Sequence, residues 1–136
     1  MARILAVDFG EKRIGLATSD ATETLATPRR TLSRKSDEAA LRELDTFCRE
    51  EEIALVVFGV PRRPSGSETD FATRIRSFAA KFAARSELPV RFHDETLTSD
   101  EAARRLPRTA SKGELDPVAA AILLEDYLQS ARAQRG

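Results

Sequence analysis

Two short runs of the chain are apolar throughout, and they restrict the possible folds more than any other feature. Residues 4–7 and 53–58 contain no polar side chain. Short runs of this kind, bounded by turn residues, are typical of strands that are buried on both faces of a sheet. Both runs are therefore expected to be buried strands of an α/β domain.

The pattern around these runs predicts three early strands and then helices that alternate with strands. The early strands are expected at 3–9, 13–18 and 24–32, with a hairpin turn at 10–12 and an edge position or bulge at Pro28. The helices that follow show helical spacing of their apolar residues. One begins at Ser36 and buries Cys48 as an inert thiol, and the other carries the stripe Phe71, Ile75, Phe78 and Phe82.

The last third of the chain is expected to hold one more strand and two helices. The strand is predicted at 90–93, a helix at 99–106, and a mobile loop at 107–115. Asp116-Pro117 is typical of a helix N-cap followed by proline in the first turn, and fraying is expected after Gln129. The whole chain, 1–136, fits one domain with a mixed five-stranded sheet flanked by helices. This is the order of elements in the ribonuclease H-like fold.

Composition excludes several classes of protein. The 22 basic and 22 acidic residues give a net charge of zero, which argues against binding nucleic acid through bulk charge. Clustered arginines and lysines at 29–35, 62–63 and 104–112 are compatible either with solvated surfaces or with a phosphate-binding rim. A single cysteine excludes a disulfide framework. No run is long enough to cross a membrane, and a cytoplasmic protein is expected.

Acidic residues at the ends of predicted strands are the strongest candidates for chemistry. Asp8 ends an apolar strand, where an unpaired charge is costly to bury. Asp94 and Glu95 end a later strand, and period-two alternation lets only one of them face the same side as Asp8. Asp116 follows at the start of the last helix. The only histidine, His93, is interpreted as a structural strand residue.

Two or three carboxylates at one sheet edge suit Mg²⁺ or Mn²⁺, which prefer hard oxygen ligands. Two such ions can activate water and stabilise a leaving 3′ oxygen during phosphodiester hydrolysis. Each acid also has a structural explanation, as a turn cap, a solvated strand end or a helix cap. The pattern alone does not choose between Asp94 and Glu95.

Four motifs, in order and spanning almost the whole chain, resemble those of the YqgF (RuvX) family. They are residues 8–20 (DFGEKRIGLATSD), residues 57–61 (VFGVP) with Gly66, residues 94–102 (DETLTSDEA), and residues 112–128. The set is specific, whereas Asp-x-Gly alone is not. Thr96 stands where the family often has arginine, and Arg62-Arg63-Pro64-Ser65 replaces a loop that usually carries asparagine. Both departures leave the acids in place and concern substrate contacts.

The resemblance implies a ribonuclease H-like fold related to Holliday-junction resolvases. It also implies a hydrolase that processes the 5′ end of bacterial pre-16S ribosomal RNA, with Mg²⁺ or Mn²⁺ as cofactor. The catalytic and metal-binding acids carry over onto Asp8, Glu95 and Asp116, which selects Glu95 over Asp94. The expected substrate contacts are Arg13, Arg62, Arg63 and Lys112.

Three other functions remain open at this point. The same chemistry could act on branched DNA, and resolvases that cut two strands symmetrically generally act as dimers, so a monomer or a homodimer is expected. Asp8-x-Gly10 also resembles the first phosphate loop of the actin and sugar-kinase superfold, although 136 residues cannot supply its two domains. A non-catalytic RNA-binding assembly factor is the remaining alternative.

Overall fold

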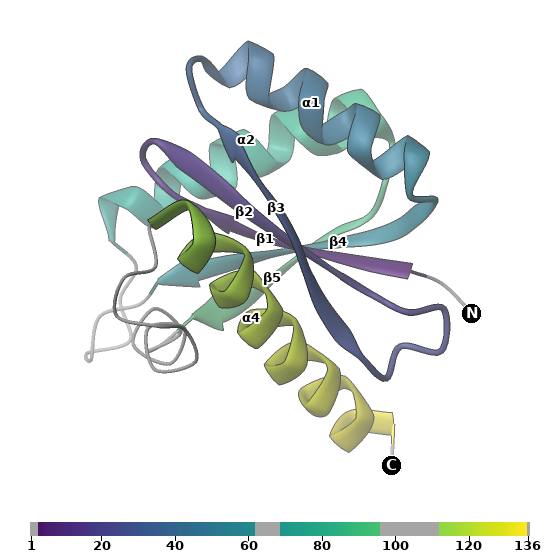
Figure 1. The fold of residues 1–136 in the computed structure, drawn as a ribbon. Coiled ribbons are helices and arrows are strands. Elements are labelled where there is room, and N and C mark those ends of the chain that lie inside the picture. The colour runs from purple at the N-terminus through teal and green to yellow at the C-terminus, as the bar shows by residue number, and fades with distance from the viewer. Residues whose placement is uncertain (1–2, 62–68, 96–111, 136) are drawn as a thin grey trace.

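A computed structural model describes residues 3–61, 69–95 and 112–135 of the chain (Figure 1). In chain order, the elements are β1 (Arg3–Phe9), β2 (Arg13–Ser19), β3 (Ala26–Ser33), α1 (Asp37–Glu50), β4 (Ile53–Pro61), α2 (Asp70–Ser86), β5 (Val90–Glu95) and α4 (Lys112–Arg135). None of the helices among the described residues is long and apolar enough to span a bilayer.

The five strands form one mixed sheet in the order β3-β2-β1-β4-β5. The hairpin strands β1, β2 and β3 pair antiparallel, whereas β1 pairs parallel with β4 and β4 pairs parallel with β5. Helices α1 and α2 cover one face, and α4 crosses the other (Figure 1). The predicted α/β class and mixed five-stranded sheet are confirmed, and the two apolar runs occupy the central strands β1 and β4.

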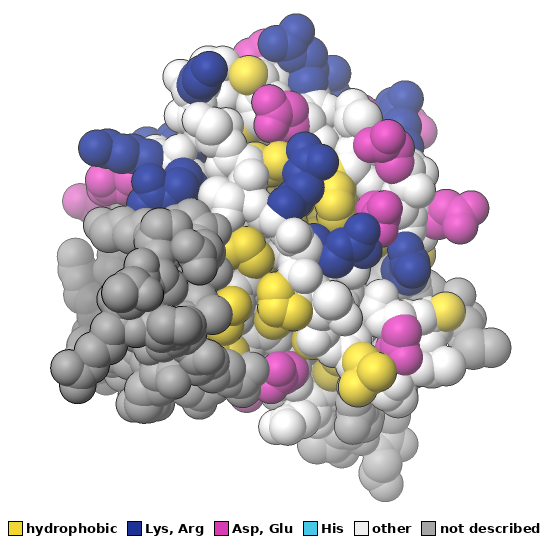
Figure 2. Space-filling view, viewed as in Figure 1, with side chains coloured by type: hydrophobic (Ala, Val, Ile, Leu, Met, Phe, Trp, Pro, Cys, Tyr) yellow, Lys and Arg dark blue, Asp and Glu magenta, His cyan; other side chains and the backbone are white. Residues whose placement is uncertain are grey.

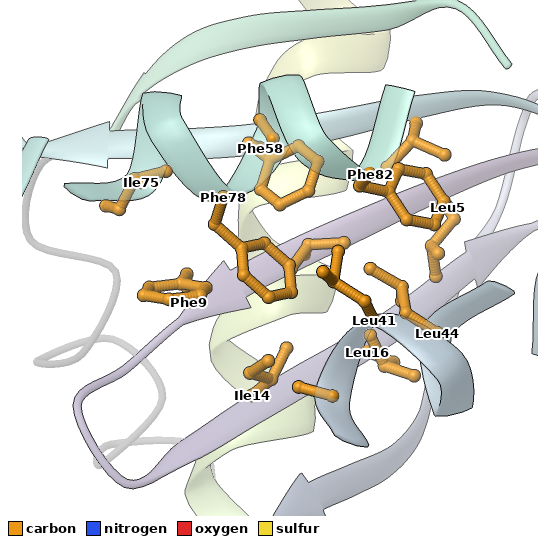
Figure 3. Close-up of a cluster of buried hydrophobic side chains, with 14 of the residues drawn as sticks. Leu5, Phe9, Ile14, Leu16, Leu41, Leu44, Phe58, Ile75, Phe78 and Phe82 are labelled. Carbon is orange, nitrogen blue, oxygen red and sulfur yellow. The ribbon is translucent and has the colours of Figure 1, made fainter. Parts of the chain in front are cut away.

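The face under α1 and α2 is packed with aromatic side chains, and we call it the aromatic face. Phe9 of β1 and Phe58 of β4 meet Phe78 and Phe82 of α2 (Figure 3). The Phe9 and Phe78 ring centroids lie 4.8 Å apart, and those of Phe58 and Phe82 lie 6.3 Å apart. The stripe predicted from helical spacing is therefore core packing. Cys48 is buried on this face as predicted, and burial raises the pKa of its thiol to about 12.

The face under α4 is packed with smaller side chains, and we call it the alanine face. Ala6 of β1 and Ala17 of β2 belong to the same buried cluster as Ala120, Ala121 and Leu124 of α4. Side chains this short allow a helix axis to lie close to a sheet, since the interaxial distance depends on the residues at the contact. This close packing of α4 on the sheet determines which strand residues the start of the helix contacts.

The third strand begins at Ala26, two residues later than predicted, because the preceding residues form a turn around Asp20. The Asp20 carboxylate accepts hydrogen bonds from the amides of Thr24 at 2.8 Å and Leu25 at 3.2 Å. A hydrogen bond from the Thr22 hydroxyl, and after it these two amide bonds, lower the pKa of Asp20 below its usual range. The prediction for Pro28 is confirmed, since β3 is a sheet edge with a register shift beside this residue.

The start of α4 differs from the prediction. The helix begins at Lys112, so residues 112–115 are helical rather than loop, and Asp116 and Pro117 lie inside the helix rather than at an N-cap. Pro117 is the sixth residue of the helix, beyond the first four amides that lack intrahelical partners, so it removes one backbone hydrogen bond from the helix. The end of α4 differs too. It continues to Arg135 rather than fraying after Gln129, in a segment rich in the helix formers Ala, Arg and Gln. The helix predicted at 99–106 lies outside the described residues.

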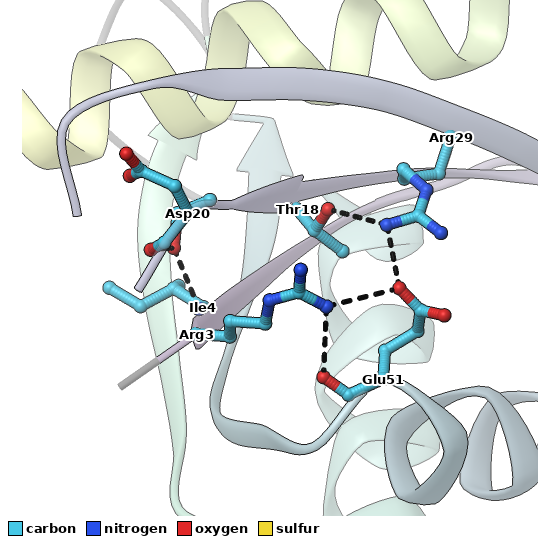
Figure 4. Close-up of polar contacts among 7 residues, drawn as sticks. Arg3, Ile4, Thr18, Asp20, Arg29 and Glu51 are labelled. Atoms are coloured by element: carbon cyan, nitrogen blue, oxygen red, sulfur yellow. Dashed lines mark hydrogen bonds and ion pairs between the residues drawn. The ribbon is translucent and has the colours of Figure 1, made fainter. Parts of the chain in front are cut away.

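The border of the aromatic face holds a small charge network at the amino end of β1 (Figure 4). Glu51, which follows α1, lies 3.3 Å from the Arg3 guanidinium and 2.6 Å from that of Arg29. Arg29 also donates to the Thr18 hydroxyl at 3.2 Å and lies over the Phe47 ring. Arg29 was one candidate for a phosphate-binding rim, and these internal contacts support the structural interpretation for it.

Candidate functional site

Asp8 lies near the carboxyl end of β1, on the alanine face. Strand side chains alternate between faces, and Val7 and Phe9 belong to the core of the aromatic face, whereas Ile4 and Ala6 belong to that of the alanine face. The alternation therefore places Asp8 on the side that α4 covers. Its side chain is half-buried, so its charge is only partly solvated by water.

Gly15 is the point at which α4 comes closest to this part of the sheet. Gly15 is paired with Asp8 across the β1–β2 ladder. A Cβ atom at Gly15 would lie 2.1 Å from the Asp116 carbonyl oxygen and 2.9 Å from the Asp116 Cβ. Only a residue without a side chain fits such a contact. Gly15 thus allows Asp116, distant in sequence, to pack on the residue paired with Asp8.

Arg13, two residues before Gly15 on the same strand, forms an ion pair with Asp116. Its Nε donates to Asp116 Oδ2 at 3.1 Å, and the two side chains are 36% and 25% exposed. Both residues line an open hollow of about 450 Å³ together with the turn residues Gly10, Glu11 and Lys12. A carboxylate, an arginine and a peptide turn therefore border a space that a ligand can enter from solvent.

The charges on the surface around this region are mixed in sign. Among the described residues, Figure 2 shows basic and acidic side chains interspersed over the upper half of one face, with hydrophobic side chains over the middle. A face of this kind does not attract polyanions through a large field of one sign, in keeping with the zero net charge of the chain.

The other predicted acids lie at the carboxyl end of β5. Glu95 is the last residue of this strand and is paired with Pro61 of β4. Asp94, one residue earlier, is exposed. Phe92 packs toward Phe58 with ring centroids 6.3 Å apart, on the aromatic face. Since β1, β4 and β5 are parallel, Glu95 and Asp8 end strands at the same edge of the sheet.

His93 connects β5 to α4 on the alanine face. Its Nε2 lies 2.5 Å from Asp126 Oδ2, and its ring packs edge-on against Tyr127 with centroids 5.8 Å apart. These contacts with the helix support the prediction that His93 is structural.

The structure thus brings Asp8, Arg13 and Asp116 together around Gly15. Among the side chains that it describes, no three His, Cys, Asp or Glu residues are grouped closely enough to hold a metal ion. Lys112 is the first residue of α4. Arg62 and Arg63 lie outside the described residues, so their predicted role stays a prediction.

Sequence reasoning missed the contact role of Gly15. A signal was present, because glycine inside a strand often marks the close approach of another backbone. The partner in this contact is Asp116 of α4, and no local pattern in β2 indicates which distant segment would approach.

Comparison with known proteins identifies the family. A family model described as "RuvX: Holliday junction resolvase" matches residues 2–130. The chain belongs to this family. A relative from Anaplasma marginale, named "Putative pre-16S rRNA nuclease", is 36% identical over 137 residues, covering 97% of this chain and 87% of its own length. A relative from Koribacter versatilis with the same name is 38% identical over 132 residues, covering 93% and 86%.

Solved structures that resemble this RuvX family member include Holliday-junction resolvases. RuvC of T. thermophilus in complex with a Holliday junction superposes with a TM-score of 0.63 at 9% identity, covering 98% of this chain and 97% of its own. The fowlpox virus resolvase in complex with junction DNA gives 0.60 at 14% identity, covering 95% and 98%. At these identities the likeness shows the fold, which is the ribonuclease H-like fold predicted from the order of elements.

Proposed function

We propose that this RuvX family member is a divalent-metal-dependent nuclease that hydrolyses phosphodiester bonds, with Asp8, Glu95 and Asp116 as its catalytic acids. The observation that carries the proposal is the packing of Asp116 on Gly15, the residue paired with Asp8. It brings acids from the first strand and the last helix to one end of the alanine face. The family's relatives are named as nucleases, which favours cleavage over binding alone.

The donor chemistry of the site suits Mg²⁺ or Mn²⁺. Asp8 and Asp116 offer carboxylate oxygens, the ligands that these ions prefer. Both side chains are half-buried, so a cation between them would be less screened than on an open surface. Asp8 and Asp116 would bind the ion together with Glu95. A bound ion would supply activation of water and stabilisation of the leaving 3′ oxygen.

Strand alternation supports Glu95 as the third acid. Position 93 faces α4, because His93 contacts Asp126 and Tyr127 of that helix. Position 95 follows on the same face by the two-residue period of a strand, whereas Asp94 shares the face of Phe92. This argument from backbone position agrees with the choice that the family resemblance implied.

Arg13 is suited to bind substrate and to hold Asp116 in place. Its guanidinium is partly exposed in the hollow while its Nε is bonded to Asp116. The remaining donors of the guanidinium fork can bind a phosphate oxygen, the geometry in which arginine is most effective. Arg62, Arg63 and Lys112 remain proposed contacts to the nucleic-acid backbone.

We infer that the substrate is the pre-16S ribosomal RNA precursor, on the names of the relatives, and that cleavage is at its 5′ end, as the motif resemblance implies. Branched DNA is the second candidate, because the family model is described as a Holliday junction resolvase. A structured RNA precursor and a four-way DNA junction, tested side by side with Mg²⁺ and Mn²⁺, separate the two. Junction cleavage without RNA cleavage would overturn the RNA assignment.

The test of the catalytic acids is Asp8→Asn. This change keeps the size of the side chain and removes its charge, and cleavage should fall by roughly 100-fold or more, since a bound ion supplies several kcal/mol and each 1.4 kcal/mol is about tenfold. Asp20→Asn, at the opposite end of β2, is the matched control and should cleave as the wild type does. Equal cleavage by Asp8→Asn would contradict the proposal. Binding of RNA without cleavage by the wild type would favour the assembly-factor alternative.

A further inference from the structure

Arg34 follows β3 and belongs to a basic cluster that the sequence offered for phosphate binding, yet its side chain is only 9% exposed. A guanidinium enclosed to this degree cannot meet a nucleic-acid backbone without a rearrangement. Buried charges need partners, and the partners of the Arg34 guanidinium indicate the role of this residue.

The polar partners of Arg34 come from the β1–β2 turn and from the start of α1. One terminal nitrogen donates to the carbonyl oxygens of Gly10 at 3.1 Å and Glu11 at 2.9 Å. Its Nε donates to Asp37 Oδ1 at 3.0 Å. The backbone amide of Arg34 donates to the Lys12 carbonyl at 2.9 Å. Arg34 therefore engages all three residues between β1 and β2.

The guanidinium also covers the end of β1, with its carbon 4.5 Å from the centroid of the Phe9 ring. A cation in this position is attracted by the face of the ring. Phe9 directly follows Asp8 in the chain. The same side chain thus contacts both the turn and the residue next to the candidate catalytic acid.

The turn that Arg34 holds is tight and leads directly into the site. The Gly10 amide donates to the Arg13 carbonyl at 2.8 Å, and a Cβ at Gly10 would lie 2.6 Å from that oxygen. Asp8 stands just before this turn, and Arg13, the partner of Asp116, stands just after it. A shift of the turn would therefore displace Asp8 and Arg13 together.

We propose that Arg34 is a positioning residue of the candidate site, which it serves by fixing the backbone of the β1–β2 turn. The inference rests on the proposed nuclease function. Arginine is required because its planar fork binds the two carbonyl groups through one terminal nitrogen and Asp37 through Nε at the same time. Lysine has one nitrogen on a flexible stem and cannot satisfy all three partners in that geometry.

The first measurement is backbone hydrogen exchange in Arg34→Lys, with Arg29→Lys as the matched control. Arg29 also lies over a phenylalanine ring and pairs with an acid, but at the other end of the sheet. Exchange in the segment 8–13 should become faster in Arg34→Lys and stay unchanged in Arg29→Lys. Unchanged exchange in both variants would overturn the inference.

The second measurement is cleavage kinetics of the same two variants with wild-type protein in parallel. Arg34→Lys should lower kcat by about 10–100-fold, the cost of a small misplacement of reacting groups, and raise KM for RNA by a smaller factor, because the turn also leads into Arg13. A raised KM with unchanged kcat would overturn the positioning role. Absence of cleavage by the wild type would contradict the proposed function, whereas the exchange result would still decide whether Arg34 fixes the turn.

Asp37→Asn provides a second variant in case Arg34→Lys does not fold. Asp37 is 45% exposed, so its replacement spares the core while it removes the counter-charge of Arg34. The same segment should exchange faster, by a smaller factor than in Arg34→Lys, and kcat should fall in the same direction. Wild-type exchange and wild-type kcat in this variant would count against the inference.

Discussion

The two faces of the sheet are built from different side chains and serve different purposes. The aromatic face packs phenylalanines from β1, β4 and α2 against one another, with large, fully buried rings. The alanine face packs small side chains from β1 and β2 against α4. Asp8, Gly15 and the Arg13–Asp116 ion pair all belong to the alanine face.

The difference shows how one sheet can combine stability with a site. Aromatic side chains bury the most apolar area for each residue and dominate core energetics. Small side chains bury less, but they let backbones approach closely, and close approach is what brings Asp116 to the strand residue paired with Asp8. Mutations on the aromatic face should therefore change stability, and mutations that push α4 away from the alanine face should change the geometry of the site.

The largest expected effect on stability comes from Phe82→Ala on the aromatic face. Phe82 is fully buried, and removing a buried phenyl ring typically costs about 3–5 kcal/mol. Urea unfolding should show this loss, whereas cleavage per folded molecule should stay near the wild-type value. Phe92→Ala is the control, because Phe92 is 38% exposed. Equal destabilisation by the two changes would contradict the conclusion that the buried rings of the aromatic face stabilise the fold.

The next largest effect is expected from Gly15→Ala on the alanine face. The added methyl group would overlap the backbone of Asp116, so α4 must shift, at a cost of about 1–3 kcal/mol for an overpacked position. Cleavage should fall by about 10–100-fold, because Asp116 moves with the helix.

The control for Gly15→Ala is Ala17→Gly, on the same strand and face. It removes a buried methyl group, creates no clash, and should cost about 1 kcal/mol of stability. Its cleavage should match that of the wild type. Full activity of Gly15→Ala would show that the approach of α4 to β2 does not position the site.

Most of the fold could be predicted from the sequence because its signals are local. The apolar runs of β1 and β4 and the phenylalanine stripe of α2 are patterns within single elements, and each was confirmed. The predicted start of α4 was wrong because Asp116-Pro117 is a strong local signal for a helix start. The structure extends the helix upstream to Lys112, so Pro117 lies inside it, and the packing of α4 on the sheet offsets the cost of the proline.

The candidate site was less predictable because its contacts join distant segments. Alternation along β5 left Asp94 and Glu95 open, and the observed contact of His93 with α4 favours Glu95. The sequence around Arg34 does not distinguish a buried arginine from one on the surface, because the carbonyls that it binds belong to Gly10 and Glu11, in the distant β1–β2 turn. Such pairings depend on the assembled sheet, so no short stretch of the sequence predicts them.

The smallest effect is expected from Glu51→Gln, at the charged border of the aromatic face (Figure 4). The change removes the counter-charge of Arg3 and Arg29, whose side chains are 42% and 32% exposed. Ion pairs this open contribute roughly 0.2–1 kcal/mol each, and the contact of Arg29 with the Phe47 ring remains. Urea unfolding should therefore show a loss of about 1 kcal/mol, which shrinks in high salt because screening weakens exposed pairs.

Glu52→Gln, at the exposed neighbouring position, is the control for Glu51→Gln, and both variants should cleave as the wild type does. A loss from Glu51→Gln that matched the loss from Phe82→Ala would mean that charges at the border stabilise this face as much as the buried rings do. Reduced cleavage by Glu51→Gln would mean that the aromatic face also sets the geometry of the site. The Glu51 network lies at the amino end of β1, whereas Asp8 lies near its carboxyl end. Either result would therefore contradict the assignment of stability to the buried rings of one face and of site geometry to the other face.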